Sequence, residues 1–469
     1  MITAQETGGF ARFDRRNSQQ AKNQEATMSK GVFDSAVAAC AAATEAQEKL
    51  VRKYSLEDRD RFIRAIRDKV MPNMELLAQM EFDETGYGRI EDKIAKNTGA
   101  VMLSQGTEAI PHNMYVSDKG LTVEYYAPYG VVGAVTPVTN PAATIIGNGI
   151  ANVAAGNAVV FNAHPGAKKT SAKTVELVNE AIVEAGGPEN LFVMVADPTL
   201  ATLDEIMAYP SVKLLVGTGG PAMVKTLMTS GKKVIAAGAG NPPSIIDDSV
   251  NLKKAAAGLL ASASFDNNLL CIAEKEIFVL DAVFDEFLEE FQAAGAYLLT
   301  PDEGKRVSAV CLVQLPDGAY FANKEHVGKM ANTILAAAGI EIDSDPRIAV
   351  YATDFNDPLV HTEQMMPIIP IVRCKDFAEA MQWAYIAEHG NRHSASIWSN
   401  DIEHVTAFGT LIDTTIFVQN GGTMAAFGIG GSGTNAPTIA TPTGEGVTGP
   451  QSFVRRRRFC MADGGNYLL

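Results

Sequence analysis

Two residues far apart in the sequence, Cys271 and Asn140, have the types needed for covalent catalysis at a carbonyl carbon. Cys271 follows the segment Ser-Phe-Asp-Asn-Asn-Leu-Leu at 264–270, and Asn140 lies in a loop rich in threonine and proline. A cysteine thiolate is a strong nucleophile, and an amide N–H can stabilise the oxyanion that forms when a thiolate adds to a carbonyl. An isolated cysteine is otherwise explained as a small buried apolar residue.

A glycine-rich turn at 217–220 is the best phosphate-binding motif in the chain. It directly follows an apolar run that ends at Val216 and precedes a helical pattern through Met223 and Leu227. Backbone N–H groups at a helix start attract phosphate, and glycine allows close approach, although a simple tight turn would have the same composition. The formal G-x-G-x-x-G at Gly428, Gly430 and Gly433 has no strand before it and no helix after it, so we expect a loop there.

The elements around these motifs predict two α/β layers. Short apolar runs typical of buried strands alternate with helical patterns, which favours a parallel sheet of the nucleotide-binding type. The expected strands are 121–126, 131–135, 158–161, 191–195 and 212–216, and the expected helices include 171–185 and 203–207. After residues 240–243 the pattern restarts with a strand at 244–246, a helix at 252–261 and a strand at 276–280.

Bulk composition excludes several classes of protein. The chain has 469 residues, 46% of them hydrophobic, which is enough for two or three domains. A net charge of -15 argues against general nucleic-acid binding. The one basic run, Arg455 to Arg458, is expected to be a strand whose charges pair with acidic neighbours, with an anion or nucleic-acid site as the alternative. The apolar tract 141–161 is interrupted by asparagines and glycines, which argues against a membrane span.

Cysteine and histidine usage points to neither a disulfide framework nor a metal site. The five cysteines are odd in number, widely spaced and without a C-x-x-C pair, so we expect a reducing compartment. His389 and His393 have helical i, i+4 spacing, but Gly390 and Asn391 lie between them and no glutamate follows the first. We therefore predict no metal ligand in this chain.

Taken in order, seven motifs resemble those of the aldehyde dehydrogenase superfamily. They are Thr-Pro-Val-Thr-Asn-Pro-Ala at 136–142, Phe-Asn-Ala-His-Pro at 161–165, the turn at 217–220, Gly-Ala-Gly-Asn-Pro-Pro at 238–243, Cys271, Glu-Gln-Met-Met-Pro at 363–367 and Thr-Pro-Thr-Gly-Glu-Gly at 441–446. The resemblance is strongest to the CoA-acylating aldehyde dehydrogenases of ethanolamine and propanediol utilisation, and it covers roughly residues 31 to 465.

The resemblance implies a role for each motif residue. Cys271 would be the nucleophile, with the Asn140 amide and the Cys271 backbone N–H as the two halves of the oxyanion hole. Thr218 and Gly220 would line the diphosphate of the cofactor, His164 and Pro165 would border its adenosine, and Glu363 would hold the nicotinamide ribose. The implied cofactor site is completed by Thr136, Pro137, Val138, Gly219 and Gly238.

Two departures from the family pattern bear on the chemistry. Hydrolytic relatives carry a water-activating glutamate before a Gly-Gly turn, and here Ala236 or Ala237 occupies that position. Since general-base catalysis contributes about 10²- to 10⁴-fold, a thioester without such a base should survive until the thiol of coenzyme A attacks it. Asn162 stands where many relatives have a lysine that contacts the adenosine ribose, and Pro165 supplies no acid to repel a 2′-phosphate. We expect NAD as the cofactor, with NADP left open.

The resemblance implies an aldehyde dehydrogenase-like fold: a Rossmann-like cofactor domain at 29–240, an α/β catalytic domain at 241–442 and a small oligomerisation element. That element would comprise a hairpin at 112–128 and a C-terminal strand within 443–469, giving a homodimer or homotetramer. We expect residues 1–28 to be a flexible tail, with a microcompartment-targeting role as an alternative. The resemblance also suggests a cytoplasmic enzyme inside a bacterial microcompartment, with shell proteins as partners.

The expected activity is the reversible conversion of propanal or acetaldehyde, NAD and coenzyme A to acyl-CoA and NADH, through a thioester on Cys271. Two alternatives remain open at this point. One is a hydrolytic aldehyde dehydrogenase that releases the free acid, and the other is a non-catalytic cargo protein of a microcompartment. Dependence of turnover on coenzyme A separates the first alternative from the expected activity.

Overall fold

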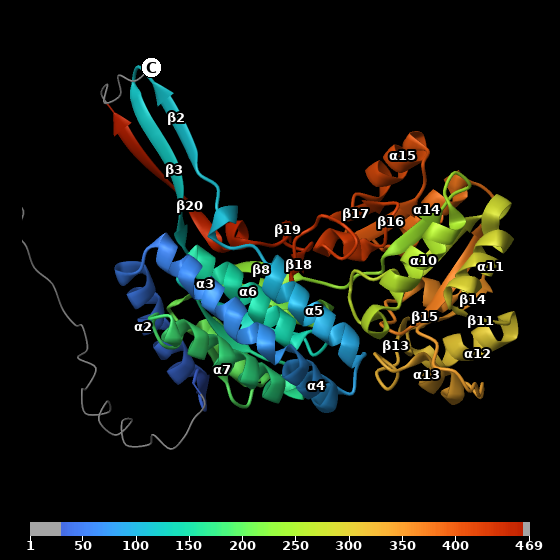
Figure 1. Cartoon of the computed structure of the whole chain (residues 1–469), viewed down its shortest axis with the longest axis horizontal. Helices are drawn as coiled ribbons and strands as arrows, with labels where there is room; N and C mark the ends of the chain where they lie inside the picture. The colour runs from blue at the N-terminus through green and yellow to red at the C-terminus, as the bar shows by residue number, and fades with distance from the viewer. Residues whose placement is uncertain (1–29, 463–469) are drawn as a thin grey trace, which may run out of the picture.

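Residues 30–462 are described by a computed structural model, in which they form two α/β bodies and one projecting arm (Figure 1). Each body is built on its own parallel sheet, which confirms the expected fold class. The expected tail at 1–28 lies outside the described residues. Within residues 30–462, no helix combines the length and the apolar character needed to cross a membrane.

The first body contains a six-stranded parallel sheet in the order β1-β6-β5-β4-β7-β8. Its strands are β1 (Val32–Phe33), β4 (Val131–Val135), β5 (Ala158–Asn162), β6 (Phe192–Val195), β7 (Val212–Thr218) and β8 (Lys233–Ala237). Its helices are α2 (Ala36–Lys53), α3 (Leu56–Val70), α4 (Met74–Thr85), α5 (Ile90–Leu103), α6 (Pro141–Ala155), α7 (Lys168–Glu184), α8 (Leu200–Ala208) and α9 (Pro221–Met228). Strands β4 and β5 are buried along their whole length, which explains their continuous apolar sequence.

Strand β4 marks the place where the order of the first sheet reverses. The chain runs from β4 through β5 to β6 on one side, and β7 and β8 then add to the other side of β4. Ligands of open α/β sheets bind beyond the carboxyl ends of the strands at such a reversal. The segments that leave β4 at Thr136 and β7 at Gly219 both start there, so the topology brings the two predicted cofactor motifs together.

The second body contains a seven-stranded parallel sheet in the order β11-β14-β15-β10-β9-β16-β17. Its strands are β9 (Pro243–Ile246), β10 (Glu276–Leu280), β11 (Tyr297–Leu299), β14 (Ala349–Thr353), β15 (Ile368–Cys374), β16 (Ser394–Trp398) and β17 (Ile416–Gln419). Its helices are α10 (Leu252–Ala263), α11 (Phe284–Ala294), α12 (Pro301–Cys311), α13 (Ala331–Ala337), α14 (Phe377–Ala387) and α15 (Ile402–Ile412). The short antiparallel pair β12 (Leu312–Gln314) with β13 (Tyr320–Ala322) accompanies it, whereas the pair β18 (Ile439–Ala440) with β19 (Gly446–Val447) lies against β8 of the first body.

The arm is an antiparallel sheet that projects away from the two bodies (Figure 1). It consists of β2 (Asn113–Ser117), β3 (Gly120–Pro128) and β20 (Val454–Ala462), with β3 in the middle. The residues of β20 after Val454 are all exposed. The arm is thus built from the two segments in which the sequence predicts an oligomerisation hairpin and a C-terminal strand.

The arginine run forms a strand as expected, but its expected charge pairing is found at only one of the four arginines. Arg458 forms an ion pair with Glu124 of β3, with 2.5 Å between the guanidinium and carboxylate. Arg455 donates to the Pro128 carbonyl, and Arg457 lies over the Tyr125 ring at 5.2 Å from its centroid. Because the arm stands clear of both bodies, the remaining guanidinium groups meet no carboxylate within residues 30–462.

Candidate functional site

The residues predicted for catalysis and cofactor binding all line one cleft, at the reversal point of the first sheet. These residues are Thr136, Pro137, Val138, Asn140, His164, Pro165, Thr218, Gly219, Gly220, Gly238, Cys271 and Glu363. Cys271 and Glu363 come from the second body, whereas the other ten come from the first. The residues predicted to bind the cofactor in the first body and the predicted nucleophile, Cys271, in the second body therefore line the same cleft.

Asn140 lies at the start of helix α6, where its side chain is only weakly restrained. The helix begins with Pro141, which suits the first helical position because proline has no N–H to leave unpaired. The Asn140 amide donates one long hydrogen bond, 3.3 Å, to the Thr139 hydroxyl, and its oxygen is buried without a protein partner. An amide held this loosely at a helix N-terminus can turn an N–H toward a developing oxyanion.

Cys271 follows a loop with an unusual backbone. After helix α10, the consecutive residues Asp266, Asn267 and Asn268 adopt left-handed φ angles of 50°, 54° and 62°. This region costs an ordinary residue roughly 1–2 kcal/mol, and asparagine and aspartate tolerate it best. The Asn268 amide secures the loop by donating to the carbonyls of Ala263 and Glu274 at 2.7 and 2.9 Å. The turn therefore has a fixed shape just before the nucleophile.

A buried lysine, Lys275, holds the same loop through hydrogen bonds. The Lys275 ammonium donates to the backbone and side-chain oxygens of Asn268, at 3.1 and 2.6 Å, and to the Leu270 carbonyl at 2.9 Å. Burial lowers the pKa of Lys275 to about 8, although nearby Glu363 acts in the opposite direction. Below about pH 8, Lys275 is charged and places a positive charge close to the Cys271 thiol.

The electrostatic surroundings hold Cys271 as a thiol in the free protein. Burial raises the pKa of Cys271 to about 12, and the Glu363 carboxylate adds to this rise. Lys275 and the backbone N–H groups of Cys271 and Ile272 act in the opposite direction and favour the thiolate. The same N–H groups can bind an oxyanion that forms on a carbonyl attached to the sulfur. A positive charge brought into the cleft would favour the thiolate further.

Glu363 is anchored at the boundary between the two bodies. It accepts a hydrogen bond from the Gly240 N–H at 3.2 Å, and burial raises its pKa, opposed by Lys275 and by this hydrogen bond. Gly240 has no room for a side chain, because a Cβ there would lie 2.7 Å from the Cys271 carbonyl oxygen. The close approach of these two backbones thus requires glycine.

No other carboxylate lines the cleft within the part of the chain that the structure describes. Ala236 and Ala237, which stand in place of the water-activating glutamate, are fully buried at the end of β8. The first residue after β8 that lines the cleft is Gly238, which has no side chain. The site therefore offers Glu363 alone as a carboxylate base near Cys271, and Glu363 is held by Gly240.

The end of the cleft expected to hold adenosine is neutral. His164, Pro165, Asn162, Thr199 and Leu200 line it, and burial lowers the pKa of His164. The Asn162 amide is occupied, since it donates to the Thr199 carbonyl at 3.2 Å and accepts from the Thr202 hydroxyl at 2.8 Å. This end contains no acidic side chain to repel a 2′-phosphate among the described residues.

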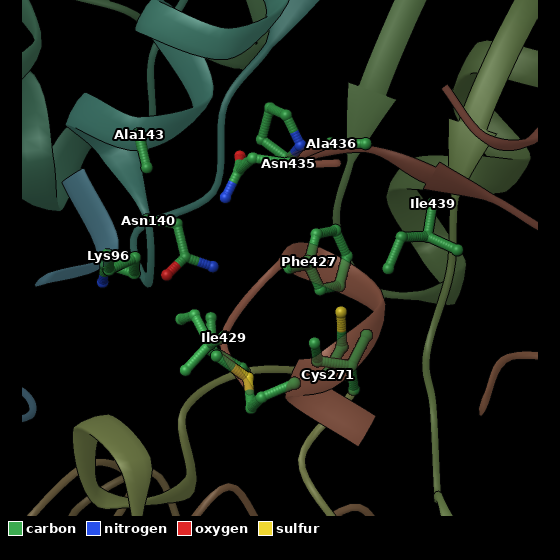
Figure 2. Close-up of a pocket in the computed structure, with 13 residues that line it drawn as sticks. Lys96, Asn140, Ala143, Cys271, Phe427, Ile429, Asn435, Ala436 and Ile439 are labelled. Atoms are coloured by element: carbon green, nitrogen blue, oxygen red, sulfur yellow. The ribbon is translucent and has the colours of Figure 1, made fainter. Parts of the chain in front are cut away.

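Cys271 also lines a second cavity, called the chamber below (Figure 2). The chamber shares Asn140, Cys271 and Pro437 with the cofactor cleft, and its wall is mostly apolar. The wall is formed by Lys96, Ala143, Leu270, Ile272, Met424, Phe427, Ile429, Asn435, Ala436 and Ile439. Because the two cavities share Cys271 and Asn140, a small molecule in this chamber and a cofactor in the cleft would meet at Cys271, as hydride transfer between them requires.

Sequence reasoning found the cofactor cleft but missed this chamber and both buried lysines near it. Met424 and Phe427 lie on a short 3₁₀ helix (Thr423–Phe427), and residues 428–436 form an irregular loop that includes the discounted glycine motif. Such loops have no periodicity that marks a pocket wall. Lys275 offered one usable signal, because it stands between Glu274 and Glu276 directly before the apolar strand β10.

The aldehyde dehydrogenase family profile matches residues 9–440 of the chain. Acetaldehyde dehydrogenase (acetylating) EutE of Escherichia coli is 42% identical over 435 residues, covering 92% of this chain and 92% of the relative. The propanal dehydrogenase (CoA-propanoylating) of Salmonella typhimurium is 41% identical over 436 residues, covering 93% of each chain. These matches extend along nearly the full length of both relatives.

Solved structures agree with the sequence relatives. A propionaldehyde dehydrogenase from the fucose utilisation microcompartment of Clostridium phytofermentans superposes with a TM-score of 0.89 at 42% identity, covering 92% of this chain and 98% of that one. A propionaldehyde dehydrogenase from Rhodopseudomonas palustris, solved with bound CoA and an acylated cysteine, gives the same TM-score at 40% identity, covering 93% and 99%. The chain belongs to the aldehyde dehydrogenase family and, within it, to the CoA-acylating acetaldehyde and propionaldehyde dehydrogenases, which confirms the activity expected from the sequence.

Proposed function

We propose that Cys271 is the nucleophile of this acylating aldehyde dehydrogenase and that Asn140 stabilises the oxyanion. The Cys271 thiolate adds to the carbonyl carbon of a short aldehyde in the apolar chamber. The Asn140 amide and the Cys271 backbone N–H hold the resulting oxyanion. As the carbonyl re-forms, the former aldehyde hydrogen leaves with its electron pair, and an acyl thioester remains on Cys271. Bound NAD supplies the acceptor for that hydride.

The observation that carries this proposal is that, among the described residues, the cleft has no carboxylate besides Glu363 and none at the position of the water-activating glutamate. Glu363, the one carboxylate that lines the cleft, accepts the Gly240 N–H, and the position of the usual glutamate is occupied by buried alanine. Water is therefore a poor acceptor for the acyl group. The acceptor is the thiol of coenzyme A: its sulfur forms the new thioester bond, its proton passes to the departing Cys271 sulfur, and acyl-CoA is released.

The cleft has the shape and chemistry to hold NAD. Gly220 leaves open space just beyond the end of β7, because a Cβ there would meet nothing within 4 Å. We propose that this turn and Thr218 hold the diphosphate, that His164 and Pro165 border the adenosine, and that Thr136, Pro137, Val138, Gly238 and Glu363 surround the nicotinamide riboside. The neutral adenosine end can also accept NADP, so NAD and NADP should differ in their affinity for the cleft, and neither is excluded.

We further propose that the arm mediates homo-oligomer formation, as a dimer or a tetramer. Four large apolar side chains on the arm are exposed: Met114, Tyr115, Phe459 and Met461. Exposed apolar groups on a thin sheet favour burial against another surface, and a second copy of the chain would bury them symmetrically. We also propose a microcompartment location, as for the similar enzyme from Clostridium phytofermentans, with shell proteins as further partners.

Coenzyme A dependence tests the proposed chemistry. The purified protein is mixed with NAD and propanal or acetaldehyde, and NADH is followed with and without coenzyme A. Sustained turnover only with coenzyme A, together with a single burst of about one NADH per site without it, is the expected result. Equal sustained turnover in both mixtures would make water the acceptor and refute the assignment.

A further inference from the structure

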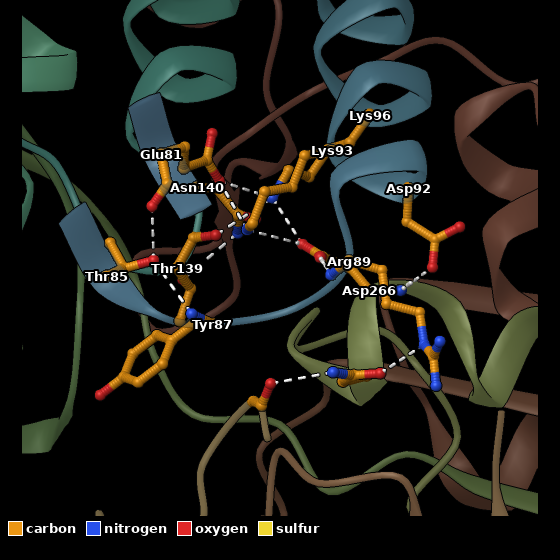
Figure 3. Close-up of polar contacts among 12 residues, drawn as sticks. Glu81, Thr85, Tyr87, Arg89, Asp92, Lys93, Lys96, Thr139, Asn140 and Asp266 are labelled. Carbon is orange, nitrogen blue, oxygen red and sulfur yellow. Dashed lines mark hydrogen bonds and ion pairs between the residues drawn. The ribbon is translucent and has the colours of Figure 1, made fainter. Parts of the chain in front are cut away.

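A buried cluster of four charged side chains lies between the two bodies, next to the active site (Figure 3). It consists of Glu81 on α4, Lys93 and Lys96 on α5, and Asp266 in the loop that leads to Cys271. Each of the four side chains is at most 6% exposed. Two ammonium groups face two carboxylates, so the cluster is neutral as a whole.

The two lysines make the same ion pairs. Lys93 reaches the Glu81 and Asp266 carboxylates at 2.9 and 3.3 Å, and Lys96 reaches them at 3.0 and 2.7 Å. Although burial alone would lower the pKa of Lys96, the Asp266 and Glu81 carboxylates raise it, so Lys96 is charged throughout the working pH range. Lys93 and Lys96 therefore neutralise the same two carboxylates and are close to equivalent in their ion pairs.

Lys96 differs from Lys93 in two contacts with the active site. Its ammonium donates a third hydrogen bond, 3.1 Å, to the Thr139 carbonyl, which is the peptide group directly before Asn140. Its side chain also lines the chamber beside Cys271, whereas Lys93 does not. One nitrogen atom thus connects the peptide of the oxyanion residue in the first body with a carboxylate five residues before the nucleophile in the second.

The partner of Lys96 is itself fixed in place. The Asp266 carboxylate accepts the Arg89 backbone N–H at 3.0 Å, and the Asp266 N–H donates to the Asp92 carboxylate at 2.9 Å. Arg89 also donates through its side chain to the Asn267 amide oxygen at 2.9 Å. The left-handed turn at Asp266 and Asn267 is therefore attached to α5 and the segment before it at several points (Figure 3).

We propose that Lys96 is a positioning residue, which sets the distance between the Asn140 amide and Cys271 through its simultaneous bonds to Thr139 and Asp266. Asn140 and Cys271 belong to different bodies, so their separation depends on contacts that cross the boundary. An oxyanion hole needs its donors within a narrow range of distance from the reacting oxygen, and misplacement by about 1 Å can cost roughly 10²-fold in rate. This inference rests on the thioester mechanism proposed above.

Two charge-balanced double variants separate positioning from stability. Glu81→Gln with Lys96→Met leaves one Lys93–Asp266 ion pair, and Glu81→Gln with Lys93→Met leaves one Lys96–Asp266 pair. Both variants remove one charge of each sign from the same cluster, so their stability losses should be similar. Only the Lys96 variant loses the bond to Thr139. The readout is single-turnover NADH formation with saturating NAD and propanal in the absence of coenzyme A.

The proposal predicts that the Lys96 double variant forms NADH roughly 10- to 100-fold more slowly than the Lys93 double variant, with equal affinity for NAD. The triple variant that combines the Lys96 double variant with Asn140→Ala should form NADH no more slowly than Asn140→Ala alone. Both changes act on the same oxyanion donor, the Asn140 amide, so their effects should not add. Equal rates in the two double variants, or fully additive losses with Asn140→Ala, would overturn it.

If the Lys96 double variant does not fold, Lys96→Arg provides the second test. A guanidinium keeps the charge of the cluster but cannot place one nitrogen at the Thr139 carbonyl and both carboxylates, so NADH formation should again be slower than in the Lys93 double variant. A rate equal to that of the Lys93 double variant would contradict the proposal. A wild-type protein that forms no NADH without coenzyme A would instead reject the thioester mechanism on which the proposal rests.

Discussion

The Lys275 ammonium donates to the Leu270 carbonyl at 2.9 Å, one residue before the nucleophile. This bond places a titrating positive charge beneath a thiol whose pKa is raised to about 12 by burial and by Glu363. The reactivity of Cys271 in the free protein is therefore limited first by burial, and the Glu363 anion and the Lys275 cation change it in opposite directions. The pH dependence of that reactivity can be measured directly.

Alkylation of Cys271 by iodoacetamide in the absence of cofactor should accelerate with pH. Because the pKa of Cys271 is about 12, the thiolate fraction should rise about tenfold per pH unit between about pH 6 and pH 7.5. The slope should become shallower near pH 8, where Lys275 loses its charge. Glu363→Gln should speed alkylation and Lys275→Met should slow it. A plateau already reached at neutral pH would contradict this electrostatic description.

Asn140→Ala should reduce turnover without weakening cofactor binding. Loss of one oxyanion donor typically lowers kcat by about 10²- to 10³-fold. The affinity for NAD should be unchanged, because the amide is restrained only by the Thr139 hydroxyl. Steady-state kinetics and fluorescence titration with NADH measure the two effects separately. An unchanged kcat would remove Asn140 from the oxyanion hole.

Gly220→Ala should distinguish the cofactor turn from an ordinary loop. A Cβ at Gly220 meets nothing within 4 Å, and its φ of -64° suits alanine, so the variant should keep the thermal stability of the wild type. If the diphosphate lies against this turn, the added methyl group should raise KM for NAD while leaving single-turnover chemistry at saturating NAD nearly unchanged. A KM equal to that of the wild type would move the diphosphate elsewhere.

Phe459→Asp should disrupt the oligomer if the arm forms the interface. Phe459 is 54% exposed in the single chain, so a charge there should cost the folded monomer little. Ile402→Asp on α15 is a matched control, because Ile402 is 68% exposed but lies outside the arm. Light scattering coupled to size-exclusion chromatography should detect a smaller species for the first variant only. An identical mass for both variants and the wild type would exclude the arm.

The sequence predicted four of the six strands of the first sheet, β4 to β7, because burial imposes a continuous apolar run on them, whereas β1 and β8 were not predicted and the expected strand at 121–126 belongs to β3 of the arm. The run at 131–135 coincides with β4, and the turn at 217–220 follows β7 as expected. Every site residue that motif order predicted lines the cofactor cleft, although other residues such as Leu200, Met223 and Met365 line it too and were not predicted. These predictions rest on local patterns in the sequence, which can be recognised without knowledge of the tertiary structure.

Features that depend on contacts between distant segments were not predictable in the same way. The left-handed turn at Asp266 is held by Arg89, which lies far away in the sequence, and local propensity gives no hint of that partner. In the sequence, Lys96 looks like an ordinary charged residue of an amphipathic helix. Its ion pair with Asp266 becomes visible only in the folded structure, where the second body packs against α5. Among the described residues, the pairing expected for the arginine run is found at Arg458 alone, because the arm stands clear of both bodies, which the sequence does not show.

The most direct test of the mechanism is the mass of the peptide that contains Cys271. The protein is incubated with NAD and propanal, quenched in acid and digested, and a parallel sample receives coenzyme A before the quench. The mechanism predicts one propanoyl group on Cys271 in the first sample and its transfer to coenzyme A in the second. An unmodified Cys271 in the first sample while NADH is formed, or a propanoyl group that coenzyme A does not remove, would contradict it.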